Sequence, residues 1–188
     1  MEFELTRYDA IKILMEYVTD EIVVCNIGIP SKELFKIKDR EKNFYMLGSM
    51  GLSSSIGHGI SLSIEKKVIA IDGDGSVLMN MGSLATIGKT TEKNFLLFIV
   101  DNCAYGSTGN QKTHSSCTDL YQVSKACAID SILVINEIEL RNALKKVLNE
   151  RGTNVILVKA RAHNENVPNI TLVPTEIKHR FMNSLKKE

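Results

Sequence analysis

The sequence predicts an α/β fold: a three-layer structure in which a six-stranded, mostly parallel sheet carries helices on both faces. Short apolar runs alternate along the chain with longer segments whose apolar residues recur at helical spacing. Two of the apolar runs lead directly into polar turns that contain aspartate or asparagine. Buried strands of parallel sheets are continuous apolar runs of this kind, and ligands bind beyond their carboxyl ends.

Six segments have the apolar composition and the short length of buried strands. A segment with helix-start character at Pro30 separates the first two, so strand and helix alternate from the beginning of the chain. This alternation predicts parallel strands joined by crossover helices. The expected strands cover residues 21–26, 43–47, 68–71, 95–100, 132–135 and 155–158.

The helical spacing of apolar residues predicts what lies between the strands. We expect helices over residues 6–19, 48–65, 77–90, 119–128 and 137–151, and a short helix that begins near Pro30. Met79 and Met81 are expected in the core, and Gly152 is expected to end the helix before it. From about residue 165 the chain reads as a polar tail, in which residues 178–187 are expected to form a short or frayed helix.

The length and the charge of the chain limit its function classes. Its 188 residues suit one domain over 1–188, with a substantial core. The net charge of +1 favours neither a nucleic-acid partner nor an electrostatic membrane anchor. No apolar run reaches the ~20 residues of a membrane span, and the charged first residues are unlike a signal peptide. We therefore expect a cytoplasmic protein.

Two polar turns at strand ends form the candidate binding site. The first is Gly73-Asp74-Gly75-Ser76, whose glycines let the backbone approach a phosphate and whose following helix directs free N–H groups to the same place. The second contains Asn102 and Ala104. A carboxylate, an amide oxygen and a main-chain carbonyl are hard oxygen ligands suited to Mg²⁺. A lone GDG is often only a tight turn, and the second turn at this distance favours the binding site.

This pair of turns resembles the signature of thiamine-diphosphate enzymes, a GDG followed after a little under thirty residues by a pair that ends in Asn. Family members usually have Asn-Asn where this chain has Asp101-Asn102, and the ligand, which is the second residue, is kept. The resemblance implies the thiamine-diphosphate-binding fold with thiamine diphosphate and Mg²⁺ as cofactors. It also implies that Asp74 and Asn102 bind the metal through their side chains and Ala104 through its carbonyl.

The run Gly48-Ser49-Met50-Gly51 resembles a second landmark of this family. By resemblance, the carbonyl of Gly48 accepts a hydrogen bond from the aminopyrimidine, and Met50 wedges between the two rings of the cofactor. The same residues would also suit a turn glycine and a core methionine, but their position one helix and one strand before the GDG favours the cofactor role. The implied cofactor-binding residues are Gly48, Ser49, Met50, Gly73, Asp74, Gly75, Ser76, Asn102, Ala104, Tyr105 and Gly106.

The longest polar stretch of the chain covers residues 105–116 and follows directly after the second turn. Long loops that bear glycine are commonly functional, and we expect this one to be a lid over the site. Lys112 and His114 suit either an anionic substrate or a solvated loop. The candidates for substrate contact are Ser107, Thr108, Gln111, Lys112 and His114.

The resemblance covers nearly the whole chain, as the diphosphate-binding half of a thiamine-diphosphate-dependent decarboxylase. The runs at 48–51, from Gly73 and from Asp101, above all residues 105–113, are most similar to the family of sulfopyruvate decarboxylase beta subunits of methanogenic archaea. That family implies conversion of 3-sulfopyruvate to sulfoacetaldehyde and CO₂ in coenzyme M biosynthesis. The alternatives are the corresponding half of a phosphonopyruvate decarboxylase, acetolactate synthase or 2-oxoacid oxidoreductase, and a non-catalytic nucleotide-binding or regulatory module.

The resemblance also implies a partner chain. In the family, the glutamate that activates the aminopyrimidine belongs to a separate pyrimidine-binding domain, and the six expected strands leave no room for such a domain here. We therefore expect an alpha subunit that carries it, a small anionic 2-oxoacid as substrate, and a hetero-oligomer with at least two of each chain.

Overall fold

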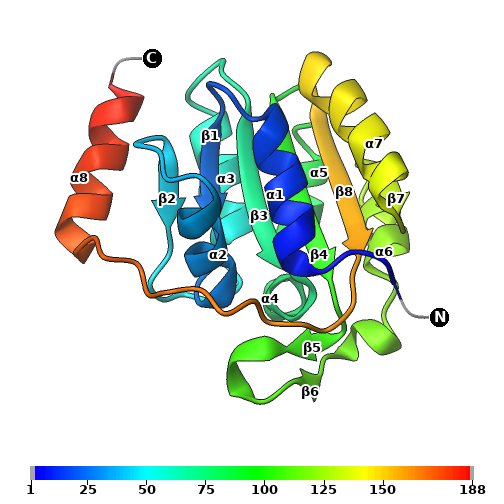
Figure 1. Cartoon of the computed structure of the whole chain (residues 1–188). Helices are drawn as coiled ribbons and strands as arrows, with labels where there is room; N and C mark the ends of the chain where they lie inside the picture. Colours follow the sequence, from blue (N-terminus) through cyan, green and yellow to red (C-terminus); the bar gives the residue numbers. More distant parts are fainter. Residues whose placement is uncertain (1–2, 187–188) are drawn as a thin grey trace.

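A six-stranded parallel sheet forms the centre of the molecule, as predicted. The computed structural model describes residues 3–186. The strand order is β2-β1-β3-β4-β8-β7, and every neighbouring pair is parallel. The strands are β1 (Ile22–Cys25), β2 (Asn43–Tyr45), β3 (Val68–Gly73), β4 (Phe95–Asp101), β7 (Asp130–Val134) and β8 (Thr153–Lys159). All six expected strands are therefore confirmed, and their carboxyl ends share one edge of the sheet (Figure 1).

Helices cover both faces of this sheet and complete the three layers (Figure 1). One face carries α1 (Arg7–Tyr17), α2 (Ile29–Ile37) and α7 (Glu137–Asn149). The other face carries α3 (Ser53–Ser61), α5 (Ser83–Gly88) and α6 (Leu120–Ala126). The short helix α4 (Asp74–Met79) lies at the carboxyl edge, against the ends of β3 and β4.

The period-two pattern of the strands divides the core into two halves. In β3, Ile69 and Ile71 belong to the cluster beneath α1, α2 and α7, whereas Val68 and Ala70 belong to the cluster beneath α3, α5 and α6. These side chains are all at most 1 % exposed. Because a parallel sheet is covered on both sides, its central strands are apolar throughout, which is why they were recognisable in the sequence.

The expected helix over residues 77–90 is wrong, because it is interrupted between α4 and α5. Asn80 ends α4, and its side-chain amide donates to Gly51 O (3.0 Å) and to Ser55 Oγ (3.1 Å). The interruption turns Met79 and Met81 outward, where they are 60 % and 38 % exposed, so their expected place in the core is also wrong. Tertiary hydrogen bonds outweigh helical spacing at this position.

The expected helix over residues 48–65 begins later, at Ser53. Ser49 and Gly51 have φ values of 60° and 93°, which a right-handed helix does not allow. Residues 48–52 therefore form a turn that carries the predicted Gly48-Ser49-Met50 landmark to the carboxyl edge of the sheet.

The predicted loop after Asn102 contains a small hairpin. Its strands are β5 (Ala104–Tyr105) and β6 (Gln111–Lys112), which pair antiparallel. Two 3₁₀ turns, η1 (Gly106–Thr108) and η2 (His114–Ser116), follow these strands. The hairpin projects beyond the carboxyl edge of the sheet (Figure 1).

The polar tail ends in a regular helix, α8 (Pro174–Leu185), which starts earlier than expected and covers the edge strand β2. The Phe181 ring packs against Phe44 with 5.2 Å between ring centroids, and Arg180 donates two hydrogen bonds to Asp39. Helix α8 therefore protects an edge that would otherwise be open to further strand pairing. Residues 161–173 reach it by crossing the carboxyl edge of the sheet (Figure 1).

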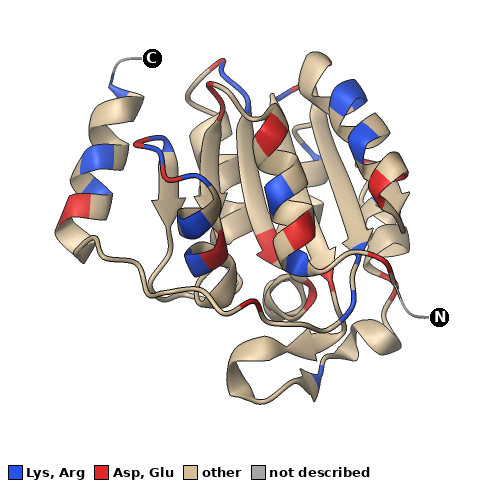
Figure 2. Cartoon of the chain, in the orientation of Figure 1, with Lys and Arg blue, Asp and Glu red and all other residues tan. Residues whose placement is uncertain are grey.

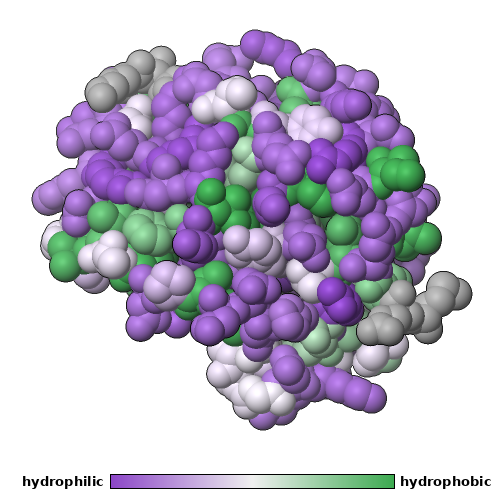
Figure 3. Space-filling model, in the orientation of Figure 1, coloured by the Kyte–Doolittle hydropathy of each residue, from purple (hydrophilic) through white to green (hydrophobic). Residues whose placement is uncertain are grey.

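The visible surface is mostly hydrophilic, with apolar side chains in small separate groups (Figure 3). Basic and acidic residues are interspersed along the helices and loops, in keeping with the net charge of +1 (Figure 2). Within residues 3–186, no helix has both the length and the apolar character needed to cross a bilayer.

We predict that Phe181→Ala lowers the free energy of unfolding by about 3 kcal/mol, because it removes a 5 % exposed aromatic ring that joins α8 to β2. Urea unfolding of the full chain measures this change. Met182→Ala, a 45 % exposed neighbour on the same helix, serves as the control and is expected to change the value by less than about 0.5 kcal/mol. Equal effects of the two substitutions would contradict the packing role of α8.

Candidate active site

A cavity of about 100 Å³ lies at the carboxyl edge of the sheet, beside the ends of β1, β3 and β4. After β1 the chain turns toward β2, and after β3 it turns toward β4, so the strand order reverses between these two neighbours. Open α/β sheets bind ligands at such a switch point. The structure brings ten predicted site residues together in the lining: Met50, Gly73, Asp74, Gly75, Ser76, Asn102, Ala104, Tyr105, Gly106 and Ser107.

Asp74 places a buried carboxylate in this cavity. It is 2 % exposed, and its Oδ2 accepts hydrogen bonds from Thr113 Oγ1 and from Ser115 Oγ (2.9 Å). Burial, together with the charge of Asp101, raises the pKa of Asp74, while the Thr113 and Ser115 hydroxyls partly oppose this shift. Within residues 3–186, no basic side chain forms an ion pair with Asp74. A buried carboxylate without a counter-ion is costly, so this position favours a bound cation.

Asp101 is a second buried carboxylate beside the first, and it does have a counter-ion. Its side chain is fully buried, and its Oδ2 lies 2.5 Å from Nζ of Lys159. Ser115 Oγ lies 2.9 Å from Oδ1 of Asp101 and 2.9 Å from Oδ2 of Asp74, so it donates to one or the other. This bridge joins the strand ends of β3 and β4 to the segment that follows the hairpin.

Asn102 and Ala104 supply the remaining predicted metal ligands. The Asn102 side chain is 7 % exposed, and its Oδ1 accepts a hydrogen bond from Ala104 N at 3.1 Å, which leaves a second lone pair. Cys103, between them, has a φ of 54°, so the backbone turns sharply here and Ala104 lines the cavity. One carboxylate, one amide oxygen and one carbonyl are the donor types that Mg²⁺ prefers, so these residues fit the metal.

The two glycines of the GDG turn have different surroundings. An added Cβ at Gly73 would meet no atom within 4 Å, so the backbone there is open, whereas one at Gly75 would lie 2.2 Å from Cε1 of Tyr105, so this glycine makes room for the Tyr105 ring. Ser76 is fully buried, and its Oγ accepts a hydrogen bond from Gly51 N at 2.9 Å. This bond fixes the turn that carries Met50 to the turn that carries Asp74, so the two predicted landmarks form one unit.

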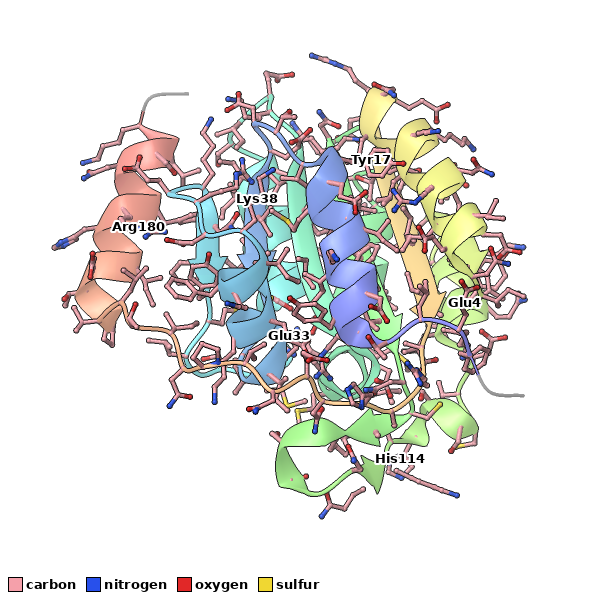
Figure 4. The ribbon with its side chains drawn as sticks, viewed as in Figure 1. Glu4, Tyr17, Glu33, Lys38, His114 and Arg180 are labelled. Carbon is pink, nitrogen blue, oxygen red and sulfur yellow. The ribbon has the colours of Figure 1, made fainter. Side chains whose placement is uncertain are left out.

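Six predicted site residues do not line the cavity: Gly48, Ser49, Thr108, Gln111, Lys112 and His114. Thr108 and Gln111 are exposed and bond to each other, with 2.5 Å between Oγ1 and Oε1. Lys112 and His114 are both exposed, and His114 lies on the segment after the hairpin, beyond the sheet edge (Figure 4). Gly48 and Ser49 are exposed beside Met50 in the turn before α3.

Other residues of the cavity were not predicted: Arg7, Asn26, Ile27, Ile29, Pro30 and Val100. Most of them follow β1, whose polar end carries no sequence signature comparable to a GDG. Arg7 does stand out in the sequence. It is the first residue of a helix capped by Thr6, and a cation is unfavourable at a helix N-terminus unless an anion compensates it.

Asp72, in β3, is a buried carboxyl group that does not line this cavity. It is 1 % exposed, its Oδ1 accepts from Gly73 N (3.0 Å), and no donor among residues 3–186 makes a hydrogen bond of good geometry to its Oδ2. Burial raises the pKa of Asp72 from 3.8 to about 6, and weak polar contacts with the Ser53 and Ser76 hydroxyls, together with the bond from Gly73 N, oppose this shift only in part. The ionised form therefore destabilises the fold.

We predict that the stability of the metal-free chain falls as pH rises from about 4 to about 6, because folded Asp72 binds a proton that the unfolded chain has already released. Asp72→Asn should flatten this slope and raise the free energy of unfolding at pH 7.5 by about 1–3 kcal/mol. Urea titrations across this range measure both effects. The exposed control Asp130→Asn should keep the slope, and an unchanged slope in Asp72→Asn would contradict the assignment.

Comparison with known proteins agrees with this geometry. Residues 27–158 match the family described as thiamine pyrophosphate enzyme, C-terminal TPP binding domain. The chain is 83 % identical over 184 residues to sulfopyruvate decarboxylase subunit beta of Methanococcus maripaludis, covering 98 % of this chain and all of that one. It is 45 % identical to the sulfopyruvate decarboxylase of Methanosarcina acetivorans, covering 96 % of this chain but 47 % of that protein.

A solved structure supports the fold. The crystal structure of benzoylformate decarboxylase from Polynucleobacter necessarius superposes with a TM-score of 0.70, over 86 % of this chain and 34 % of that one, at 21 % identity. The fold, the paired turns at the switch point and the full-length sequence match lead to one conclusion. The chain belongs to the thiamine pyrophosphate enzymes and, among them, to the family of sulfopyruvate decarboxylase beta subunits.

Proposed function

We propose that this chain is the diphosphate-binding subunit of a decarboxylase that converts 3-sulfopyruvate to sulfoacetaldehyde and CO₂. The observation that carries the proposal is the gathering of Asp74, Asn102 and Met50 in one cavity at the switch point of the sheet. The full-length match to a beta subunit supports the choice of substrate. No feature of the cavity favours the acetolactate-synthase or oxidoreductase alternatives, or a non-catalytic module.

The residues of the cavity divide the binding of thiamine diphosphate between them. Asp74, Asn102 and the carbonyl of Ala104 would hold Mg²⁺, and the backbone at Gly73 and Gly75 would bind the diphosphate. Bound thiamine diphosphate would supply an electron sink for the charge left when CO₂ departs. Met50 lies in the lining and is held there by the Gly51–Ser76 hydrogen bond, so its side chain would contact the two rings of the cofactor.

The cavity lacks a group that decarboxylation of this kind requires. A carboxylic acid must hydrogen-bond the aminopyrimidine. Among the described lining residues, Asp74 is the only acidic side chain, and we assign it to the metal. We therefore assign the activating glutamate to an alpha subunit. A relative named sulfopyruvate decarboxylase, of which this chain matches about half, supports a second half of similar length. We further propose Mg²⁺ as the metal, a cytoplasmic location, at least two copies of each chain and a place in coenzyme M biosynthesis.

The experiment that tests this function separates the two chains. This chain is purified alone, supplied with thiamine diphosphate and Mg²⁺, and assayed on sulfopyruvate; the candidate alpha chain is then added. We expect no turnover before the addition and full turnover after it. Turnover by this chain alone would refute the half-site assignment, and no turnover of the complex would refute the substrate.

We also predict that Asp74→Ala and Asn102→Ala abolish Mg²⁺-dependent retention of thiamine diphosphate, because each removes one of the metal's oxygen ligands. Calorimetric titration of the assembled complex with cofactor, with and without Mg²⁺, measures this loss. Asp130→Ala, which removes an exposed carboxylate at the opposite end of the sheet, is the matched control and should bind normally. Normal retention in both site variants would overturn the metal assignment.

A further inference from the structure

Arg7 is a buried cation that lines the active-site cavity and that the proposed cofactor binding does not use. It is 6 % exposed, and it is the only basic side chain among the described residues of the lining. The candidates expected to meet an anion, Lys112 and His114, lie outside this lining. The substrate class proposed above carries a second anionic group besides its carboxylate, and that group needs a donor.

Two neighbours hold the guanidinium of Arg7 in one orientation. Its Nε donates to Glu33 Oε2 (2.7 Å) and its Nη2 to Glu33 Oε1 (3.0 Å), with the Glu33 side chain fully buried. Nη2 also donates to Asn164 Oδ1 at 3.1 Å. Glu33 lies in the first turns of α2, at the carboxyl edge of the sheet (Figure 4). A guanidinium held in this way loses little freedom when it binds a further ligand.

These contacts leave part of the guanidinium free for a ligand. A guanidinium has five N–H donors, and the bonds to Glu33 and Asn164 use the one on Nε and the two on Nη2. No residue among 3–186 accepts from the remaining pair on Nη1. These two N–H groups point in different directions, so an oxygen of a sulfonate can accept a charge-assisted hydrogen bond from one of them while the other meets a second acceptor.

The position of Arg7 favours the substrate over the cofactor diphosphate. Asn164, which accepts from Arg7, donates to Gly106 O at 2.8 Å, so Arg7 is linked to the backbone just before Ser107, at the start of the hairpin segment. The diphosphate has its own partners in the metal and in the GDG backbone. Resting on the proposed function, we propose that Arg7 binds the sulfonate group of the substrate and so selects 2-oxoacids that carry a second, tetrahedral anion.

The test uses the assembled complex, with Arg7 and Glu33 replaced together. Arg7→Gln alone would leave Glu33 as an uncompensated buried charge, so Arg7→Gln/Glu33→Gln removes both charges and keeps polar side chains of similar shape. We expect the KM for sulfopyruvate to rise about 10- to 100-fold, with kcat and the dissociation constant of thiamine diphosphate within about 3-fold of wild type. Arg7→Lys, which keeps the charge but not the fork, should give an intermediate KM.

A second measurement does not depend on turnover. Calorimetry with 3-sulfopropionate, an unreactive analogue that carries both anionic groups, should show the same loss of affinity in the double variant. Arg141→Gln/Glu137→Gln removes an exposed arginine–glutamate pair on α7 and is the control that should change neither quantity.

Each outcome decides the assignment. A parallel loss of thiamine-diphosphate affinity would place Arg7 at the diphosphate. Unchanged KM and analogue affinity in a folded double variant would make the Arg7–Glu33 pair a structural link only. Either result overturns the proposal. If the wild-type complex binds 3-sulfopropionate without turning over sulfopyruvate, the proposed function fails, while the calorimetric comparison still decides the role of Arg7.

Discussion

Two carboxylates, Asp74 and Asp101, are buried next to each other at the ends of adjacent strands, and the rest of the carboxyl edge is arranged around them. Their charges would repel and would be poorly solvated without compensation. The pairing of β4 with β8 compensates the charge of Asp101. In this register Asp101 lies opposite Lys159, and the two side chains form an ion pair. Asp74 has no such partner among residues 3–186, which leaves the demand for a cation at the cavity.

The same constraint explains why the hairpin segment folds back onto the sheet. Thr113 and Ser115 are buried, although their neighbours are exposed, because their hydroxyls meet the two carboxylates. Thr113 N also donates to Cys103 O at 3.1 Å, so both ends of the hairpin segment are fixed near Asp74 and Asp101. The exposed residues between them, including Lys112, therefore project from an anchored base, which is compatible with the lid that the sequence predicts.

The sequence predicted the structure well where a single requirement, such as burial on both faces of a strand, determines the residue types. Strands covered on both faces must be apolar, and so β3 and β4 could be recognised together with the polar turns that end them. It was misleading where tertiary contacts compete with local preference. The amide of Asn80 interrupts a helical pattern and leaves Met81 38 % exposed, although the spacing of that methionine suited a core residue. Arg7 contacts Glu33 across 26 positions of the chain, and only its unfavourable place at a helix N-terminus marks it in the local sequence.

The charges of the cavity suit two kinds of ligand for different reasons. Asp74 is a buried charge without a counter-ion, so a cation there gains from Coulombic attraction as well as coordination. Arg7 is already neutralised by Glu33, so an anion at its remaining N–H pair gains chiefly from hydrogen-bond geometry and little from net charge. A 2-oxoacid without a second anionic group would leave the buried N–H groups of Nη1 unpaired, and this would lower its affinity. On the proposed assignment, selectivity for a second anion therefore does not require a strongly positive cavity.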